Sequence, residues 1–197
     1  MLTELPLFPL SVFLLPGEKS KIHIFEQKYK QLLADCEESQ SPFGIPFALN
    51  NSISEYGSIV KIIDELATHA DGSSDIEIQC TDIFKIQTYY TQLGEKLYPG
   101  GNVILLNSPS QTVSENLMSE IGKYLEKSEK KLTPDMLSIH LNAYDAARII
   151  PLNGLEKIRL VKADSSEKKE MILLNKLKIL GQLQKQRKSV AHNIFLN

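Results

Sequence analysis

The pattern of apolar residues at the start of the chain is broken by proline. Apolar runs occupy residues 5–10 and 12–15, and three prolines interrupt or end them. Because proline fixes φ and has no backbone N–H to donate, neither run can form a helix. The pair Pro16 and Gly17 predicts a turn. We therefore expect two short strands, joined by a turn, that lead into the next element.

A helical period follows at residues 25–38. Phe25, Tyr29, Leu32 and Leu33 recur at spacings that place them on one face of a helix. Polar side chains fill the other face, as they do in a helix that covers one side of a core. We therefore predict a helix that starts near Phe25.

Residues 43–106 show the short apolar runs and turn residues of strands. Pro46 places its strand at a sheet edge or at a bulge, because it cannot donate to a strand ladder. A gap is expected around 55–57, and Thr81-Asp82 interrupts a later run. The predicted strands are 43–49, 59–63, 76–80, 84–88 and 103–106, with turns at 50–52 and 71–74. Many short strands with one helix among them indicate a small barrel-like sheet.

Beyond residue 110 the apolar period becomes helical. The predicted helix starts are a capping box of Thr112 and Glu115, Thr133-Pro134, and Asp164 with Glu167. The last helix should reach about Lys188, with an apolar side formed by Met171, Leu174, Leu177 and Leu180. This change of period divides the chain near residue 110 into a β-rich half and an α-helical half.

The opening motif carries a family resemblance. The letters LPLFPL, LLPG and IFE stand at 5–10, 14–17 and 24–26, and a tyrosine follows at position 29. In this order they resemble the opening of the Lon protease N-terminal domain family, the Lon substrate-binding domain. The family's FE-x-R-Y appears here as FEQKY, with Lys28 in place of arginine. This exchange keeps the charge but loses the bidentate guanidinium.

A second part of the resemblance lies around the Asp71-Gly72 turn. The family's strand pattern appears here as GSIVKI at 57–62, IEIQC at 76–80 and FKI at 84–86. Cys80 departs from the usual strand-end pattern, and Ile83 stands where arginine often precedes the phenylalanine. The resemblance spans nearly the whole chain and is most specific in its first half.

The resemblance to a stand-alone Lon N-terminal domain implies both a fold and a function. The expected fold is α+β, with a PUA-like small β-barrel and one inserted helix over residues 1–110. An α-helical bundle subdomain should follow over residues 111–197. The implied function is non-catalytic binding of unfolded or tagged polypeptides, as an adaptor or holdase in protein quality control. The implied partners include a protease or a chaperone.

The net charge of the chain and the length of its apolar runs bear on whether it binds nucleic acid or a membrane. The 197 residues include 22 Lys and Arg against 24 Asp and Glu, a net charge of -2, whereas proteins that bind nucleic acid are usually clearly basic. Because PUA-like barrels often bind RNA, the alternative function is RNA or nucleotide binding through the barrel. No run approaches the roughly 20 apolar residues of a membrane span, so we expect no membrane contact.

The chemistry-bearing residues do not form a recognisable catalytic pattern. Gly122-Lys123 is not part of a phosphate-binding loop, and no glycine-flanked serine indicates a nucleophile elbow. The histidines, at 23, 69, 140 and 192, are scattered without ligand spacing. We therefore expect no metal, no cofactor and no enzyme activity. The remaining hypothesis is a small-molecule enzyme, whose mark would be a deep cavity with a strongly shifted acid or base.

The two cysteines point to a cellular compartment. Cys36 and Cys80 lie far apart in the sequence and lack the spacing of metal ligands. We interpret both as free thiols of a structural kind, which persist in a reducing compartment. The sequence therefore predicts a cytoplasmic protein.

Aromatic residues near strand edges are the candidates for polypeptide binding. Phe43 and Phe47 share a face of an edge-like strand, and Tyr89 and Tyr90 follow the run at 84–88. Exposed edges accept an added peptide strand and exposed aromatics anchor side chains. The alternative is that these four residues complete the barrel core or its junction with the helices. The apolar tail at 189–197 either docks on the bundle or contacts a partner, and the last helix could form a homodimer.

Overall fold

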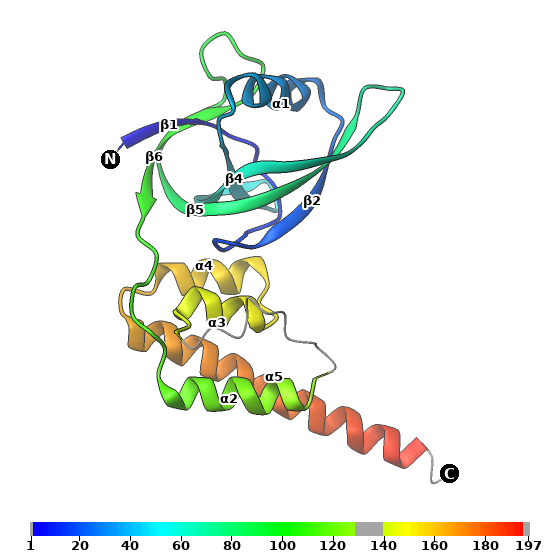
Figure 1. Cartoon of the computed structure of the whole chain (residues 1–197), viewed down its shortest axis with the longest axis vertical. Helices are drawn as coiled ribbons and strands as arrows, with labels where there is room; N and C mark the ends of the chain where they lie inside the picture. Colours follow the sequence, from blue (N-terminus) through cyan, green and yellow to red (C-terminus); the bar gives the residue numbers. More distant parts are fainter. Residues whose placement is uncertain (1, 129–139, 195–197) are drawn as a thin grey trace. The chain divides into compact units, whose positions relative to one another are not determined.

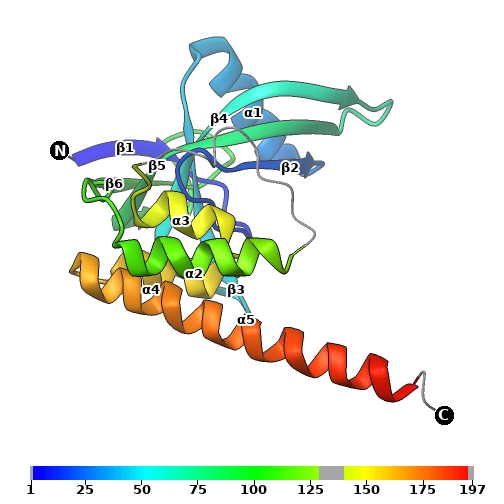
Figure 2. The same cartoon turned by 60° about the horizontal axis from the view of Figure 1, so that its bottom comes forward.

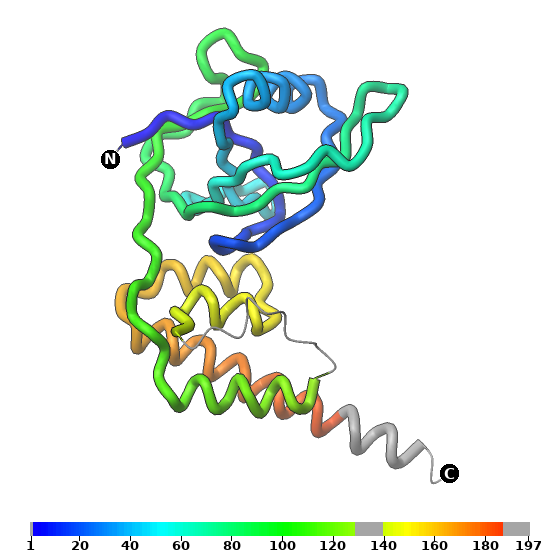
Figure 3. Tube along the Cα trace, in the orientation of Figure 1, coloured from blue at the N-terminus to red at the C-terminus, as the bar shows by residue number. Residues whose placement is uncertain are grey.

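The computed structural model describes residues 2–128 and 140–194, with side chains up to residue 186. The chain forms two compact units (Figures 1 and 3). The first comprises Met1–Ser108 and Asn153–Ile158, and the second comprises Pro109–Leu152 and Arg159–Asn197. The predicted helix start at Thr133-Pro134 lies outside the described residues, as do the last three residues of the apolar tail.

The first unit is built on a six-stranded antiparallel sheet and one helix. Its elements are β1 (Leu2–Pro6), β2 (Lys19–Ile24), α1 (Gln27–Ser39), β3 (Phe43–Leu49), β4 (Ser52–Thr68), β5 (Ser74–Tyr90) and β6 (Gly100–Leu106). The strand order is β1-β6-β5-β4-β3, and β2 pairs with the first part of β5. The two long strands β4 and β5 cross the whole unit (Figure 1).

The chain segment after β1 closes the sheet on itself. Residues 7–10 run beside β3 and form isolated bridges at Leu7 and Leu10. Phe8 N donates to Gly44 O at 2.8 Å, and Ala48 N donates to Leu10 O at 2.7 Å. The first strand predicted from the apolar runs is therefore β1 with this bridging segment. Residues 12–15 form no strand, and the turn at Pro16-Gly17 is confirmed.

Glycines make room for large side chains inside the closed sheet. A Cβ on Gly57 would lie 2.3 Å from Phe84 Cζ, and one on Gly44 would lie 2.6 Å from Leu7 Cδ2. Phe84 and Leu7 have no exposed surface. A second, larger cluster joins α1 to the sheet, where the Tyr29 ring stacks on a phenylalanine of the closing segment at 3.9 Å.

Where the sequence predicted breaks between strands, the structure has continuous strands that contain bulges. The register of β3 and β4 shifts at Pro46, which confirms the predicted bulge or edge position. β4 and β5 are each continuous over 17 residues, so the predicted gap at 55–57 is wrong. Thr81 is the extra residue of a bulge opposite Ile59 and Val60, and β5 continues through it. A bulge disturbs the two-residue alternation without ending the strand.

Buried polar contacts fix the loop that precedes β2. Ser58 is fully buried, and its Oγ accepts from Leu14 N at 2.9 Å and donates to Leu14 O at 2.7 Å. Glu18 Oε2 accepts from Leu15 N at 2.7 Å and from Lys157 Nζ at 2.5 Å. The side chains of this ion pair are only 18% and 12% exposed. Partners far apart in sequence thus hold this loop, which has no regular secondary structure.

The second unit is helical. Its helices are α2 (Glu115–Glu126), α3 (Ala143–Ile149) and α5 (Ser166–Ile194), together with the end of α4 (Gly154–Lys162), of which Arg159–Lys162 belong to this unit. Ser114 caps α2 through Leu117 N, so the predicted capping box of Thr112 and Glu115 is wrong. Thr112 forms a strand-like bridge with Asn142 instead. The helix α5 begins two residues after the predicted Asp164.

The buried face of α5 matches the predicted one in part, since Leu177 is buried and Leu174 and Leu180 are partly buried. α5 packs against α2 and α3. Leu173 and Leu177 are its buried side chains within the described range, whereas Met171 is 56% exposed. The predicted apolar side included Leu174, whereas the neighbouring Leu173 is the residue that is buried. Two adjacent leucines fit the helical period almost equally well, so the sequence could not tell which one faces the core. α5 reaches Ile194, which is past the predicted end at Lys188.

The contact between Ser58 and Leu14 yields a prediction about stability. We expect Ser58→Ala to lower the free energy of unfolding of the first unit by about 1–3 kcal/mol, because Leu14 N–H is left buried without an acceptor. Leu14 O keeps a contact, since Cys80 Sγ lies 3.3 Å from it. Denaturant unfolding followed by circular dichroism measures the change. Ser108→Ala, at an exposed position, is the control. Equal unfolding midpoints for the two variants would contradict the prediction.

Candidate functional site

One stretch of β4 has an edge that no other strand pairs with among the residues the structure describes. β3 pairs with β4 up to Val60, opposite Phe43. The following residues, Lys61–Thr68, pair with β5 alone among the described residues. We call this stretch the β4 edge. It belongs to the part of the β4–β5 hairpin that projects beyond the rest of the sheet (Figure 2). Unpaired N–H and C=O groups on such an edge are a template for another strand.

Two bulges on the β4 edge turn apolar side chains outward. The register shifts between Ile62 and Asp64, and again between Glu65 and Ala67. Ile63 and Leu66 are therefore the extra residues of the two bulges. Their exposed fractions are 39% and 41%. Bulges often re-aim a side chain, and here they place two large aliphatic side chains in solvent within four positions of the chain.

The surroundings of these apolar side chains are acidic. Asp64 and Glu65 stand between Ile63 and Leu66 and are exposed. Glu37, near the end of α1, carries a raised pKa because burial disfavours its charged form and Glu65 repels it. The β4 edge therefore combines aliphatic contacts with a negative local charge. This combination suits a partner segment that carries both apolar and basic residues.

A cavity lies where the β4 edge meets the end of α1. Its volume is about 350 Å³. Its lining residues are Cys36, Glu37, Gln40, Ser41, Lys61 and Ile62. Burial raises the pKa of the Cys36 thiol to about 11, so the thiol is not a nucleophile at neutral pH. The cavity can accept a side chain, but the groups in its wall are not arranged as a nucleophile with a base.

A larger cavity of about 660 Å³ lies in the second unit, between the start of α2 and the start of α5. Glu170 in its wall accepts from Ser114 N at 2.8 Å and from Ser114 Oγ at 2.5 Å. This carboxylate is engaged in capping α2. The lining contains no histidine, cysteine or lysine. The third hypothesis, an enzyme site with a strongly shifted acid or base, gains no support from this cavity.

The four aromatic residues predicted to bind polypeptide do not form one surface. Phe43 is fully buried and Phe47 is 6% exposed, with the Phe47 ring packed against Gly154. Tyr89 is partly buried against the Phe84 cluster. Tyr90 is partly buried as well, and its hydroxyl accepts from Asn102 Nδ2 at 2.7 Å. The phenylalanines are core residues, and a role for the tyrosines in binding stays a prediction.

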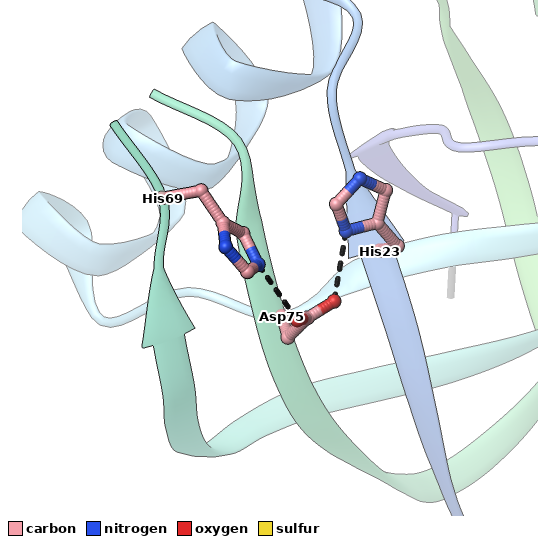
Figure 4. Close-up of side chains that lie close together, drawn as sticks. All are labelled: His23, His69 and Asp75. Atoms are coloured by element: carbon pink, nitrogen blue, oxygen red, sulfur yellow. Dashed lines mark hydrogen bonds and ion pairs between the residues drawn. The ribbon is translucent and has the colours of Figure 1, made fainter. Parts of the chain in front are cut away.

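The structure gathers residues that sequence spacing left apart. His23, His69 and Asp75 lie together near the tip of the β4–β5 hairpin (Figure 4). They are residues of the kinds that bind metal ions, and they come from β2, the turn after β4, and β5. Sequence spacing gave no sign of this cluster, because strand pairing brings His23 and Asp75 together across 52 positions. The cluster lies in the same hairpin as the β4 edge.

Comparison with known proteins places the fold. A family model described as the ATP-dependent protease La (LON) substrate-binding domain matches residues 4–186. A crystal structure of a Lon N-terminal domain protein from Xanthomonas campestris is similar with a TM-score of 0.70 and 24% identity, over 88% of this chain and 98% of that chain. The N-terminal domain of Mycobacterium avium complex Lon protease is similar with a TM-score of 0.60 and 14% identity, over 89% and 98%.

These findings confirm the predicted family and the α+β fold. At these identities the two solved structures support the fold alone. No curated protein matches the chain at a significant level. The family match is to a substrate-binding domain rather than to a catalytic one. Within residues 2–128 and 140–194, no helix combines the length and apolar character needed to cross a lipid bilayer. The description of the sheet as PUA-like stays a prediction.

Both thiols are predicted to be unreactive in the folded protein. Burial raises the pKa of Cys36 to about 11 and that of Cys80 to about 12. At pH 8 only about one Cys36 side chain in a thousand is then a thiolate, and the thiolate is the reactive form. We expect slow reaction with a disulfide reagent such as DTNB in buffer and rapid reaction of both thiols in denaturant. Cys36→Ser and Cys80→Ser separate the two signals. A fast native phase that disappears in Cys36→Ser would show that the cavity is open enough to activate this thiol.

Proposed function

The chain belongs to the Lon substrate-binding domain family, and on that premise we propose that it binds polypeptide segments at the β4 edge. The observation that carries the proposal is the open edge of Lys61–Thr68, from which two bulges turn Ile63 and Leu66 into solvent. An extended segment added to a sheet edge gains main-chain hydrogen bonds, while side-chain contacts supply its specificity. Unfolded polypeptides offer the required extended backbone.

The chemistry of the β4 edge also suggests which segments bind. Ile63 and Leu66 offer apolar contact, and the cavity at the end of α1 offers room for one further side chain. Asp64 and Glu65 favour basic residues in the partner through charge complementarity, which steers encounter and fixes register. We infer that the preferred segments are extended, contain aliphatic residues and carry a positive charge.

The same charges favour polypeptide over RNA. Phosphate groups would approach Asp64, Glu65 and Glu37 against electrostatic repulsion, and the whole chain has a net charge of -2. Binding to nucleic acid depends on lysines and arginines that neutralise phosphates. For the first unit we therefore favour polypeptide binding over RNA or nucleotide binding.

The role that fits such a module is capture without catalysis. No Walker A motif occurs in the 197 residues, and the family match covers a substrate-binding domain. We infer that the protein acts as an adaptor or holdase in the cytoplasm, and that a protease or chaperone receives the bound segment. In this proposal residues 1–110 form a PUA-like part that binds polypeptide, and residues 111–197 form a helical subdomain, apart from Asn153–Ile158, which belong to the first unit.

Binding of a labelled unfolded polypeptide tests the proposal. We expect saturable binding by fluorescence anisotropy at low and at moderate salt. The double variant Ile63→Ser and Leu66→Ser should weaken binding about tenfold or more, because about 1.4 kcal/mol of apolar contact corresponds to a factor of ten. Both positions are exposed, so the fold is retained, and circular dichroism checks this.

A matched control lies at the opposite end of β4. Leu49 and Ile53 are 41% and 43% exposed and flank the turn between β3 and β4. The double variant Leu49→Ser and Ile53→Ser removes a similar apolar surface where β3 covers the edge, and we expect it to bind like the wild type. Equal losses in both double variants, or no binding at tens of micromolar protein, would refute the β4 edge as the site. Tight binding of RNA that falls steeply with salt would support the alternative function.

A further inference from the structure

Three side chains near the tip of the β4–β5 hairpin converge on one point (Figure 4). His23 Nδ1 lies 2.8 Å from Asp75 Oδ1, and His69 Nε2 lies 2.8 Å from Asp75 Oδ2. One potential ligand atom from each residue lies within 4.8 Å of the others. The carboxylate of Asp75 thus stands between two imidazole nitrogens that both face it.

Strand pairing fixes two of the three residues. His23 on β2 is directly opposite Asp75 on β5 in the antiparallel register. Directly opposite residues of antiparallel strands bring their Cβ atoms to about 5 Å, which is close enough for both side chains to share one ion. The Phe25 ring stacks beside the His23 ring, with ring centroids 5.8 Å apart. The positions of these side chains therefore follow from the sheet and not from a flexible loop.

The turn between β4 and β5 fixes the third residue. His69 N donates to Ser73 O at 2.8 Å, and Gly72 N donates to His69 O at 2.9 Å. Asp71 Oδ1 accepts from Ser73 N at 3.0 Å and from Ser73 Oγ at 2.7 Å. These hydrogen bonds within the turn hold the backbone of His69, and the contact of its Nε2 with Asp75 Oδ2 orients the imidazole before any ion arrives. Ligand positions that exist in advance reduce the ordering cost of binding.

The donor set selects the class of ion. Two imidazole nitrogens and one carboxylate oxygen match the ligands of Zn²⁺, which binds such groups at about 2.0–2.2 Å. Mg²⁺ and Ca²⁺ prefer sites made of oxygen atoms alone. Neutral imidazole can carry its proton on the nitrogen away from the ion, so zinc can replace both hydrogen bonds to Asp75 without breaking the arrangement. Small shifts of the side chains bring the three ligand atoms to coordination distance.

We propose that His23, His69 and Asp75 form a binding site for Zn²⁺. Three protein ligands leave a fourth tetrahedral position open, as in zinc sites that hold a water molecule or an external ligand. The side chains are 39–49% exposed, so an ion reaches them from solvent. Bound zinc joins β2, β5 and the turn after β4, and so clamps the tip of the hairpin. This proposal stands independently of polypeptide binding at the β4 edge.

Titration of the full chain with zinc tests the proposal. We expect one Zn²⁺ ion per chain by calorimetry and a higher unfolding temperature in its presence, because an ion that binds only the folded state stabilises it. Co²⁺ should give the visible absorption of a four-coordinate ion with nitrogen and oxygen ligands. His69→Ala and Asp75→Asn should each weaken zinc affinity by about tenfold to a hundredfold, the range by which even supporting residues affect metal sites.

A surface histidine outside the cluster provides the control. His140 is exposed and lies in the second unit, and we expect His140→Ala to bind zinc like the wild type. Circular dichroism of the metal-free variants shows whether each retains its fold, and Asp75→Asn preserves the shape of the side chain it replaces. Absence of zinc binding by the folded wild type would overturn the site. So would unchanged affinity in both cluster variants, which would leave the three residues as a hydrogen-bonded group that joins the strands.

Discussion

The structure of the first unit depends on closure of its sheet by residues 7–10. This short segment donates and accepts main-chain hydrogen bonds along β3, and it does so where prolines prevent a regular strand. Leu7 can lie against the sheet because Gly44 and Gly101 have no side chains there, and a Cβ at either position would come within 3.0 Å of it. Loss of this closure would expose the edge of β3 and open the core beside Phe84.

Closure explains why another edge stays open. The closing segment pairs with one edge of β3, and on its other edge β3 pairs with β4 only as far as Val60. The rest of β4 continues outward with β5, while β2 covers the other side of β5. The projecting hairpin is thus a three-stranded extension with β5 at its centre. The proposed polypeptide site occupies one side of this extension, and the His23, His69 and Asp75 cluster occupies its tip.

The sequence predicted the fold better than it predicted the surface. Proline and glycine positions identified the turn at Pro16-Gly17 and the bulge at Pro46, because these residues restrict the backbone directly. The bulges that expose Ile63 and Leu66 carry no such residue, so alternation alone could not find them. The burial of Phe43 agrees with the alternative of a core role, but the strand pattern alone could not choose between a core role and binding, since it does not tell which face meets the core when both faces are apolar. The His23 and Asp75 pair depends on register, which is a property of the folded sheet.

An exposed edge with aliphatic side chains raises the question of self-association. Two copies that paired through their β4 edges would bring Asp64 and Glu65 of one chain toward the same residues of the other, and like charges across a strand pair are destabilising. The bulges also twist the edge away from flat pairing. The same features do not hinder a single extended segment that carries basic residues. Negative charge at the β4 edge therefore disfavours pairing between two copies of the protein but still allows a basic polypeptide segment to bind. An exposed edge needs this selectivity because its backbone groups could otherwise pair with any other chain.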